Sequence, residues 1–278
     1  MELRINMIYF SQTGNTKKVA KAIGEQFKEN GHMAQIMPIE SADSSLVLDC
    51  DLIGIGCPCF TSRVPTPVSK FVEGIPYLNG KPAFIFATSG GAPGRVLYDL
   101  KVLLEKRGAK VIGGLLVRGE LFYPVPCLKG RFHGRPDNYD IDRARHFAKS
   151  ILEHISDSEN VTYDEGSPKL LKRRLNLYNA VGVILSDSLI HALLPEPKFD
   201  HGKCEKCGAC ARGCPTGSIS LKPFPVLGGN CIRCYNCLNV CPEEAVRTNM
   251  TRANLIISSL YGKTFERIFG DVEKGEKM

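Results

Sequence analysis

Eight cysteines in the last third of the chain have the residue type and the spacing to bind metal. They form two runs of the same pattern, C-x2-C-x2-C-x3-C-P. The first run is Cys204, Cys207, Cys210 and Cys214, and the second is Cys231, Cys234, Cys237 and Cys241. Each cysteine of the second run lies 27 residues after its counterpart, which indicates an internal duplication. Thiolate sulfur is a soft ligand that suits zinc and iron–sulfur clusters.

The spacing favours clusters over zinc, because zinc sites usually pair two cysteines with two further ligands. A disulfide framework is typical of small secreted modules, and no secretory signal is recognised. The runs are similar to those of bacterial ferredoxins, in which the fourth cysteine of each run binds the other run's cluster. This resemblance implies one [4Fe–4S] cluster on Cys204, Cys207, Cys210 and Cys241, and a second on Cys231, Cys234, Cys237 and Cys214. Proline after each fourth cysteine predicts short helical turns over 216–219 and 243–246.

A second group of candidate binding residues follows an apolar run of strand length at 3–10. It reads Ser11, Gln12, Thr13, Gly14, Asn15 and Thr16, and apolar residues at helical spacing come next. Backbone N–H groups and the positive end of a helix dipole bind phosphate at such a turn, and the hydroxyl groups add donors. The alternative is an ordinary helix N-cap. The P-loop lysine and the GxGxxG fingerprint are both absent from the sequence.

Residues 11–16 resemble the S/T-x-T-G-N-T phosphate loop with which flavodoxins bind FMN. Further strands are expected over 34–39, 51–57, 83–88 and 111–117, and helices over 67–75, 95–107 and 141–155. Strands that alternate with helices predict a parallel sheet covered on both faces. The resemblance implies an α/β flavodoxin-like, doubly wound, five-stranded parallel sheet in the order 2-1-3-4-5, with FMN at its carboxyl edge.

Two further loops fall at that edge, and the resemblance implies that they contact the flavin ring. The candidate residues are Pro58, Cys59, Phe60 and Thr61 after the third strand, and Thr88, Ser89, Gly90 and Gly91 after the fourth. Phe60 is the expected stacking residue, and a hydrophobic loop anchor is the alternative. The chain departs from many flavodoxins because it has no tryptophan and its last loop is rich in glycine. One residue between Cys57 and Cys59 is not the CxxC redox spacing, which disfavours a redox dithiol.

Length and composition indicate a globular protein with more than one domain. The chain has 278 residues, 43% of them hydrophobic, and a formal charge of +7 that bound clusters and a flavin phosphate would offset. Basic residues between positions 118 and 135 form either a solvated face or a docking face for an acidic electron carrier, and nucleic acid is not expected as a partner. A helical stretch at 170–194 is too interrupted to span a membrane. A last helix is expected at 255–269.

The expected domains are a flavodoxin-like FMN domain at 1–160, a helical linker at 161–197, a small α+β two-cluster ferredoxin domain at 198–250, and a C-terminal helix and tail at 251–278. This order resembles the flavodoxin–ferredoxin fusion proteins of anaerobic bacteria and archaea. Arg63-Val64-Pro65, Pro136-Asp137-Asn138-Tyr139 and Lys198-Phe199 share the resemblance.

The resemblance implies a cytoplasmic electron-transfer iron–sulfur flavoprotein that passes electrons between two [4Fe–4S] clusters, FMN and an external redox partner. That partner is a ferredoxin-type protein, another flavoprotein or a small acceptor. Two alternatives stay open: an FMN-dependent reductase of a quinone or flavin, and a redox sensor whose clusters are structural. No acid–base or nucleophilic constellation stands out, so no catalytic residue is predicted. Donor, acceptor, direction of electron flow and oligomeric state are left open by the sequence.

Overall fold

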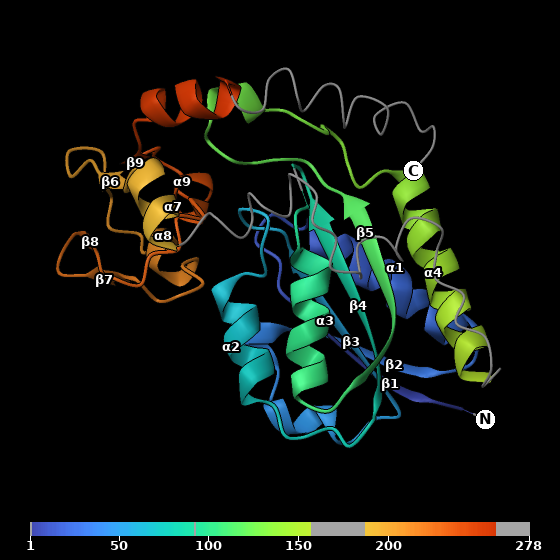
Figure 1. Cartoon of the computed structure of the whole chain (residues 1–278). Coiled ribbons are helices and arrows are strands. Elements are labelled where there is room, and N and C mark those ends of the chain that lie inside the picture. Colours follow the sequence, from blue (N-terminus) through green and yellow to red (C-terminus); the bar gives the residue numbers. More distant parts are fainter. Residues whose placement is uncertain (1, 92, 157–186, 260–278) are drawn as a thin grey trace. The chain divides into compact units, whose positions relative to one another are not determined.

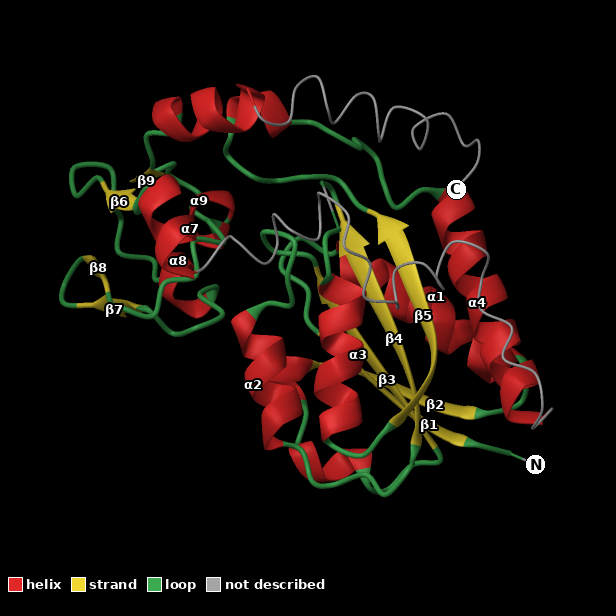
Figure 2. Ribbon diagram, viewed as in Figure 1, coloured by secondary structure: helices red, strands yellow, loops and turns green. Residues whose placement is uncertain are grey.

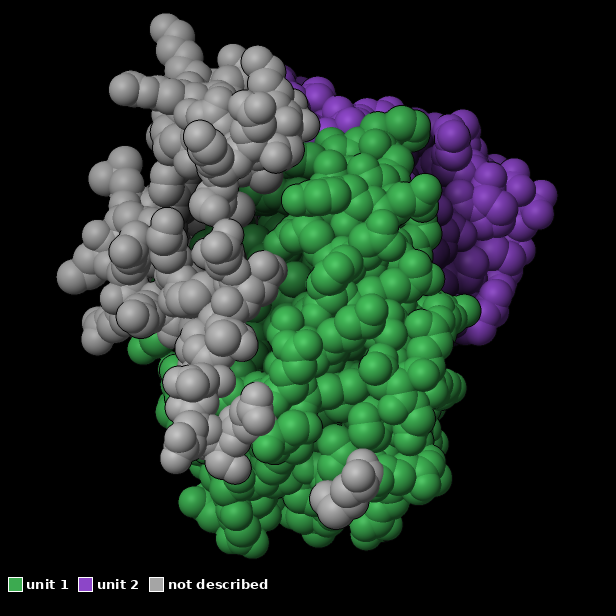
Figure 3. All heavy atoms as spheres, turned by 90° about the vertical axis from the view of Figure 1, so that its right-hand side faces the viewer, with its two compact units in different colours: residues 1–120, 132–182 green, residues 121–131, 183–278 purple. Residues whose placement is uncertain are grey.

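The structure is a computed structural model that describes residues 2–91, 93–156 and 187–259. The chain divides into two compact units, coloured separately in Figure 3. Unit 1 comprises Met1–Glu120 and Phe132–Gly182, and unit 2 comprises Leu121–Arg131 and Val183–Met278. The segment Leu121–Arg131 therefore belongs to the unit that contains the cysteine runs, which the sequence did not indicate.

Unit 1 contains a five-stranded parallel sheet in the order β2-β1-β3-β4-β5. Its strands are β1 (Arg4–Tyr9), β2 (Met33–Pro38), β3 (Leu52–Pro58), β4 (Pro82–Ser89) and β5 (Lys110–Arg118). The register aligns the carboxyl ends of neighbouring strands, since Tyr9 lies opposite Gly56 and Pro58 opposite Thr88. The predicted flavodoxin-like topology is confirmed.

Helices cover both faces of this sheet (Figures 1 and 2). One apolar layer joins the sheet to α1 (Asn15–Glu29) and α4 (Asn138–Ser156). The opposite layer joins it to α2 (Thr66–Gly74) and α3 (Val96–Lys106). Short 3-10 helices at Ile39–Ser41 and Ser44–Val47 lie between β2 and β3. Successive strand residues point to opposite faces, so the sheet contributes to both layers.

Close packing across β3 and β4 depends on glycine. Phe84 and Phe86 are fully buried on β4, and they face Gly54 and Gly56 of β3. A Cβ atom on Gly56 would lie 2.0 Å from the Phe86 ring. The missing side chain therefore makes room for a large aromatic one, whose burial contributes about 1.5–3 kcal/mol.

Unit 2 repeats one pattern of elements twice. The first copy is β6 (Lys198–Phe199), α8 (Ala209–Arg212) and β7 (Ile219–Leu221), and the second is β8 (Pro225–Leu227), α9 (Asn236–Asn239) and β9 (Val246–Arg247). The strands pair antiparallel across the copies, β6 with β9 and β7 with β8. Helix α7 (Asp187–Leu193), the 3-10 turn Pro126–Leu128 and helical residues 251–259 complete the unit. The predicted helices at 170–194 and 255–269 lie partly outside the described residues.

The helical turns predicted after each Cys-Pro pair were wrong. The short helices α8 and α9 precede the fourth cysteine of each run, and turns that lead into β7 and β9 follow it. Gly217 and Glu244 occupy matching places in these turns with φ of 60° and 47°. Such left-handed backbone interrupts a right-handed helix.

Candidate functional site

The eight cysteines of unit 2 surround two separate cavities. Cys204, Cys207, Cys210 and Cys241 line one cavity, whose empty volume is about 380 Å³. Cys214, Cys231, Cys234 and Cys237 line the other, whose empty volume is about 320 Å³. Each cavity therefore takes three cysteines from one run and the fourth from the other, which is the crossed grouping expected from the spacing.

Backbone geometry around the two cavities obeys the same duplication. Lys206 and Arg233, the second residues after the first cysteine of each run, have φ of 57° and 54°. Gly208 and Tyr235 precede α8 and α9 with φ of 74° and 57°. The left-handed residues let each loop curl, so that its three cysteines converge on one cavity.

Amide groups also approach the sulfur atoms of the crossing cysteines. The N–H of Ser218 donates to Cys214 Sγ at 3.2 Å, and the N–H of Ala245 donates to Cys241 Sγ at 3.3 Å. Hydrogen bonds of this kind favour a charged thiolate. Burial, reinforced by the thiols of Cys234 and Cys231, raises the pKa of the Cys237 thiol to about 12. Binding a metal to such a thiol removes its proton, which couples ligation to relief of this penalty.

The arrangement of the cysteine sulfur atoms fits a metal cluster better than a single metal ion. Among the described residues, which include all eight cysteines, no three His, Cys, Asp or Glu side chains converge to hold a single metal ion. Each set of four thiols instead encloses a cavity, and four thiolates are the donor set of a [4Fe–4S] cluster.

The predicted phosphate loop joins β1 to α1 in unit 1. Gly14 is the N-cap of α1 with φ of 90°, a conformation that glycine adopts without strain. Ser11 Oγ accepts a hydrogen bond from the N–H of Lys17 at 3.3 Å, and Thr13 is exposed. The first N–H groups of a helix have no intrahelical partner, so the start of α1 is suited to an anion.

Thr16 differs from the other hydroxyl residues of the loop because its side chain is buried. Its Oγ1 shares a hydrogen bond of 2.8 Å with Thr88 Oγ1, at the end of β4. The neighbouring Asn15 donates from Nδ2 to the carbonyl of Glu120 at 2.9 Å, just after β5. These side chains connect the first loop to the ends of β4 and β5, a role that the sequence did not show.

The loop after β3 turns tightly at Thr61 and Ser62, whose φ values are 46° and 65°. Phe60 and Arg63 exchange backbone hydrogen bonds of 3.1 and 2.9 Å across this turn. The Phe60 ring is half-buried and meets Phe10 edge-on at 6.1 Å. Phe60 thus anchors its loop to the core, and stacking on a flavin stays a prediction.

The loop after β4 is tied to its neighbours. The N–H of Cys59 donates to the Thr88 carbonyl at 2.8 Å, and the N–H of Arg95 donates to the Ser62 carbonyl at 3.1 Å. Ser89 Oγ donates to the Gly91 carbonyl at 2.9 Å. The predicted ring-binding residues therefore gather at one edge of the sheet, and their contacts with a flavin stay predictions.

Arg118, at the end of β5, is a site residue that sequence reasoning missed. Its side chain is 5% exposed, donates to the Gly91 carbonyl at 2.7 Å and lies 5.0 Å from the Phe132 ring centroid. Burial lowers the pKa of this guanidinium to about 10, so it stays charged at neutral pH. A buried positive charge thus holds the glycine-rich loop.

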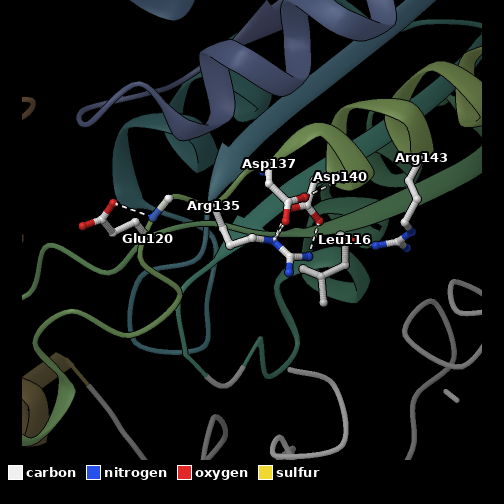
Figure 4. Close-up of polar contacts among 7 residues, drawn as sticks. Leu116, Glu120, Arg135, Asp137, Asp140 and Arg143 are labelled. Carbon is white, nitrogen blue, oxygen red and sulfur yellow. Dashed lines mark hydrogen bonds and ion pairs between the residues drawn. The ribbon is translucent and has the colours of Figure 1, made fainter. Parts of the chain in front are cut away.

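Figure 4 shows a second arginine in this region, Arg135, pointing at Asp137 and Asp140. Arg135 Nη2 donates to Asp140 Oδ1 at 2.7 Å, and Asp140 is fully buried at the start of α4. The side chains of Asp137 and Asp140 each accept from the other's backbone N–H at 3.1 Å, which caps α4. Arg118 and Arg135 are therefore not part of a solvated basic face.

Cys57 and Cys59 have the character of inert thiols. Cys57 is fully buried in β3, and burial raises its pKa far above the ordinary range. Loss of solvation also raises the pKa of Cys59 to about 12. Because the thiolate is the reactive form, these residues are poor candidates for redox chemistry.

Two four-cysteine cavities and a flavodoxin-like sheet with polar loops at its carboxyl edge define an electron-transfer iron–sulfur flavoprotein. In the described part of the chain, no helix combines the length and apolar character that crossing a membrane requires.

Comparison with known proteins identifies both parts. The flavodoxin domain family matches residues 6–127, and the 4Fe-4S dicluster domain family matches residues 196–242. An uncharacterised protein of Methanocaldococcus jannaschii is 30% identical over 143 residues, which cover 50% of this chain and 91% of that protein. A flavodoxin of Megasphaera elsdenii is 30% identical over 118 residues, covering 41% of this chain and 85% of the flavodoxin. A polyferredoxin of Methanothermus fervidus is 45% identical over 47 residues, which are 16% of this chain and 11% of the polyferredoxin.

The chain therefore belongs to the flavodoxin family through its N-terminal part, and with the 4Fe-4S domain that follows it is a flavodoxin–ferredoxin fusion. The flavodoxin domain implies FMN, and the dicluster domain implies iron–sulfur clusters.

Proposed function

We propose that the protein passes electrons between two [4Fe–4S] clusters, FMN and an external redox partner. The observation that carries this proposal is the pair of cavities, each lined by four cysteines in the crossed arrangement. When bound, the clusters supply one-electron transfer, and the flavin supplies one-electron and two-electron steps. A chain with both cofactors can therefore connect a one-electron donor or acceptor with a two-electron one.

The proposed ligands of the first cluster are Cys204, Cys207, Cys210 and Cys241, and those of the second are Cys231, Cys234, Cys237 and Cys214. Two features support eight thiolate ligands. The left-handed loop residues bring the cysteines of each loop to one cavity, and amide groups donate to the sulfur atoms of Cys214 and Cys241.

The proposed FMN site uses the three loops at the carboxyl edge of the sheet. Residues 11–15 and the start of α1 bind the phosphate through backbone N–H groups and the exposed Thr13 hydroxyl. Residues 58–61 and 88–91 border the ring. Thr16 and Arg118 hold these loops through Thr88 and Gly91, so they act as positioning residues.

We further propose a cytoplasmic location, where reduced thiols persist, and a redox protein or small acceptor as the partner. An assay with reduced ferredoxin or NAD(P)H as donor and a panel of protein, quinone and flavin acceptors separates an electron carrier from a flavin-dependent reductase. Turnover with a small acceptor alone would favour the reductase.

Cofactor analysis of anaerobically purified protein tests the proposal. We expect about eight iron, eight acid-labile sulfide and one FMN per chain. Stoichiometric zinc in place of iron, or FAD in place of FMN, would contradict it.

A further inference from the structure

The two cluster loops carry different charges at matching positions. Lys206 and Arg233 each stand two residues after the first cysteine of a run. Lys206 is exposed, and its ammonium lies 4.6 Å from the Phe224 ring centroid. Arg233 is only 6% exposed. The duplication has therefore placed one cation at the surface and the other inside the unit.

Arg233 is held beside the second cysteine run by few polar contacts. Its Nη2 pairs with Glu196 Oε1 at 2.7 Å, and the Glu196 side chain is 63% exposed. Its Nε and Nη1 are buried without a hydrogen-bond partner in the protein. An arginine side chain keeps its proton in proteins, so the buried guanidinium is a permanent positive charge within the second cysteine run.

Two tyrosines hold Arg233 in this position. Tyr123, in the segment Leu121–Arg131, donates a hydrogen bond from its hydroxyl to the Arg233 carbonyl at 2.9 Å. The Tyr123 ring meets Tyr235 edge-on at 5.3 Å, and the Tyr235 hydroxyl donates to the Pro195 carbonyl at 2.7 Å. Tyr235 is 2% exposed, so these contacts fix the arginine in surroundings with little water.

The residues that line the two cavities also differ in charge. Two carboxylates and one ammonium line the cavity of the first cluster, those of Glu205, Glu243 and Lys206, and Cys207 there is exposed. Ile232 and Thr216 occupy the matching positions at the second cavity, whose lining contains no acidic residue among the described residues. The lining of the first cavity therefore carries a net negative charge on exposed side chains, whereas the second cavity has a mostly apolar lining and a buried cation in the loop that forms it.

We propose that Arg233 raises the reduction potential of the second cluster above that of the first, which makes the second cluster the preferred electron acceptor of unit 2. Reduction adds one electron to a cluster and breaks no bond. A fixed positive charge in surroundings of low polarity stabilises that added negative charge, and nearby carboxylates oppose it. This inference rests on the two clusters of the proposed function.

Anaerobic redox titration followed by electron paramagnetic resonance tests the inference. In the wild type we expect two resolved cluster potentials. In Arg233→Gln the higher one should fall, so that at its former midpoint the ratio of reduced to oxidised cluster drops about tenfold, equivalent to about 59 mV for one electron. Lys206→Gln is the matched control. It should change either cluster potential much less than Arg233→Gln changes the higher one, because water screens an exposed charge.

Two more variants separate charge from packing. Arg233→Lys keeps the positive charge and should keep most of the potential difference. Glu196→Gln removes an exposed negative partner and should leave the higher potential unchanged or raise it. If Arg233→Gln does not assemble its clusters, these two variants still decide: a fall in the higher potential in Glu196→Gln would overturn the inference.

Iron and sulfide analysis of each protein distinguishes the two possible failures. A wild type with fewer than about eight iron atoms would contradict the proposed function itself. A full complement of iron with unchanged potentials in Arg233→Gln, or with an equal shift in Lys206→Gln, would overturn only the role of Arg233.

Discussion

The two units of this chain form their cores in different ways. In unit 1, large side chains pack in two layers on either side of a continuous sheet, with Phe84 and Phe86 in one layer and Phe10 in the other. In unit 2, one apolar cluster gathers around Val125, Ile190 and Tyr235, and a second includes the predicted ligands Cys210 and Cys237 themselves. Unit 1 thus stabilises its fold with apolar side chains, whereas unit 2 places metal ligands where a core would be.

From this difference we infer which cofactor is needed for folding. Small units with short strands bury too little apolar surface to be stable alone, and metal ligation commonly supplies the missing free energy. FMN should therefore bind a sheet that is already folded, whereas the clusters should be part of the folding of unit 2.

Removing the iron is expected to have the largest effect on this comparison. Protein prepared without clusters should lose the structure of residues 198–250, while residues 2–120 and 132–156 of unit 1 stay folded. Limited proteolysis with mass spectrometry should cut apo protein within unit 2 and leave unit 1 intact, still able to bind FMN. Equal protection of both units in the apo protein would contradict the comparison.

Overpacking the core of unit 1 should have the next largest effect. In Gly56→Ala, the new methyl group would meet the Phe86 ring at 2.0 Å, so we expect a loss of about 1–3 kcal/mol in the free energy of unfolding. Gly74→Ala is the control, because a Cβ atom there meets nothing within 4 Å. Urea denaturation followed by FMN fluorescence measures both. A similar loss in the two variants would argue against a core set by aromatic packing, and cluster content should not change in either.

The two threonines of the phosphate loop should have smaller, separable effects. Thr16→Ala leaves the buried Thr88 hydroxyl without its partner and should lower the stability of unit 1 by about 1–3 kcal/mol. Thr13→Ala removes only an exposed hydroxyl and should weaken FMN binding by about 0.5–1.5 kcal/mol while leaving apoprotein stability unchanged. FMN titration and urea denaturation of the apoprotein measure the two effects. Unchanged FMN affinity in Thr13→Ala would count against this loop as the phosphate site.

The sequence predicted the elements whose signals are local. Apolar runs indicated the five strands, and the cysteine spacing indicated which four thiols share a cavity. The sequence could not show that Thr16 turns inward to Thr88, or that Arg118 is buried under the glycine-rich loop, because both depend on strands far apart in the chain. Tyr235 is another example: tyrosine rarely adopts a left-handed conformation, and Tyr123 and Pro195 hold it there through tertiary contacts. The helical turns expected after each Cys-Pro pair failed for a local reason, since Gly217 and Glu244 take positive φ.

The proposed electron transfer between the clusters and the flavin is tested most directly by rapid mixing with a reduced ferredoxin-type donor. Cys237→Ala removes a proposed ligand of the second cluster, and Cys127→Ala, which changes a cysteine outside both cavities, is the control. We expect bleaching of the flavin to slow at least about tenfold in Cys237→Ala and to keep its wild-type rate in Cys127→Ala, while direct chemical reduction of FMN stays unchanged in both. Equal rates of flavin reduction by the protein donor in the wild type and Cys237→Ala would show that electrons reach FMN without the clusters, and would contradict the account.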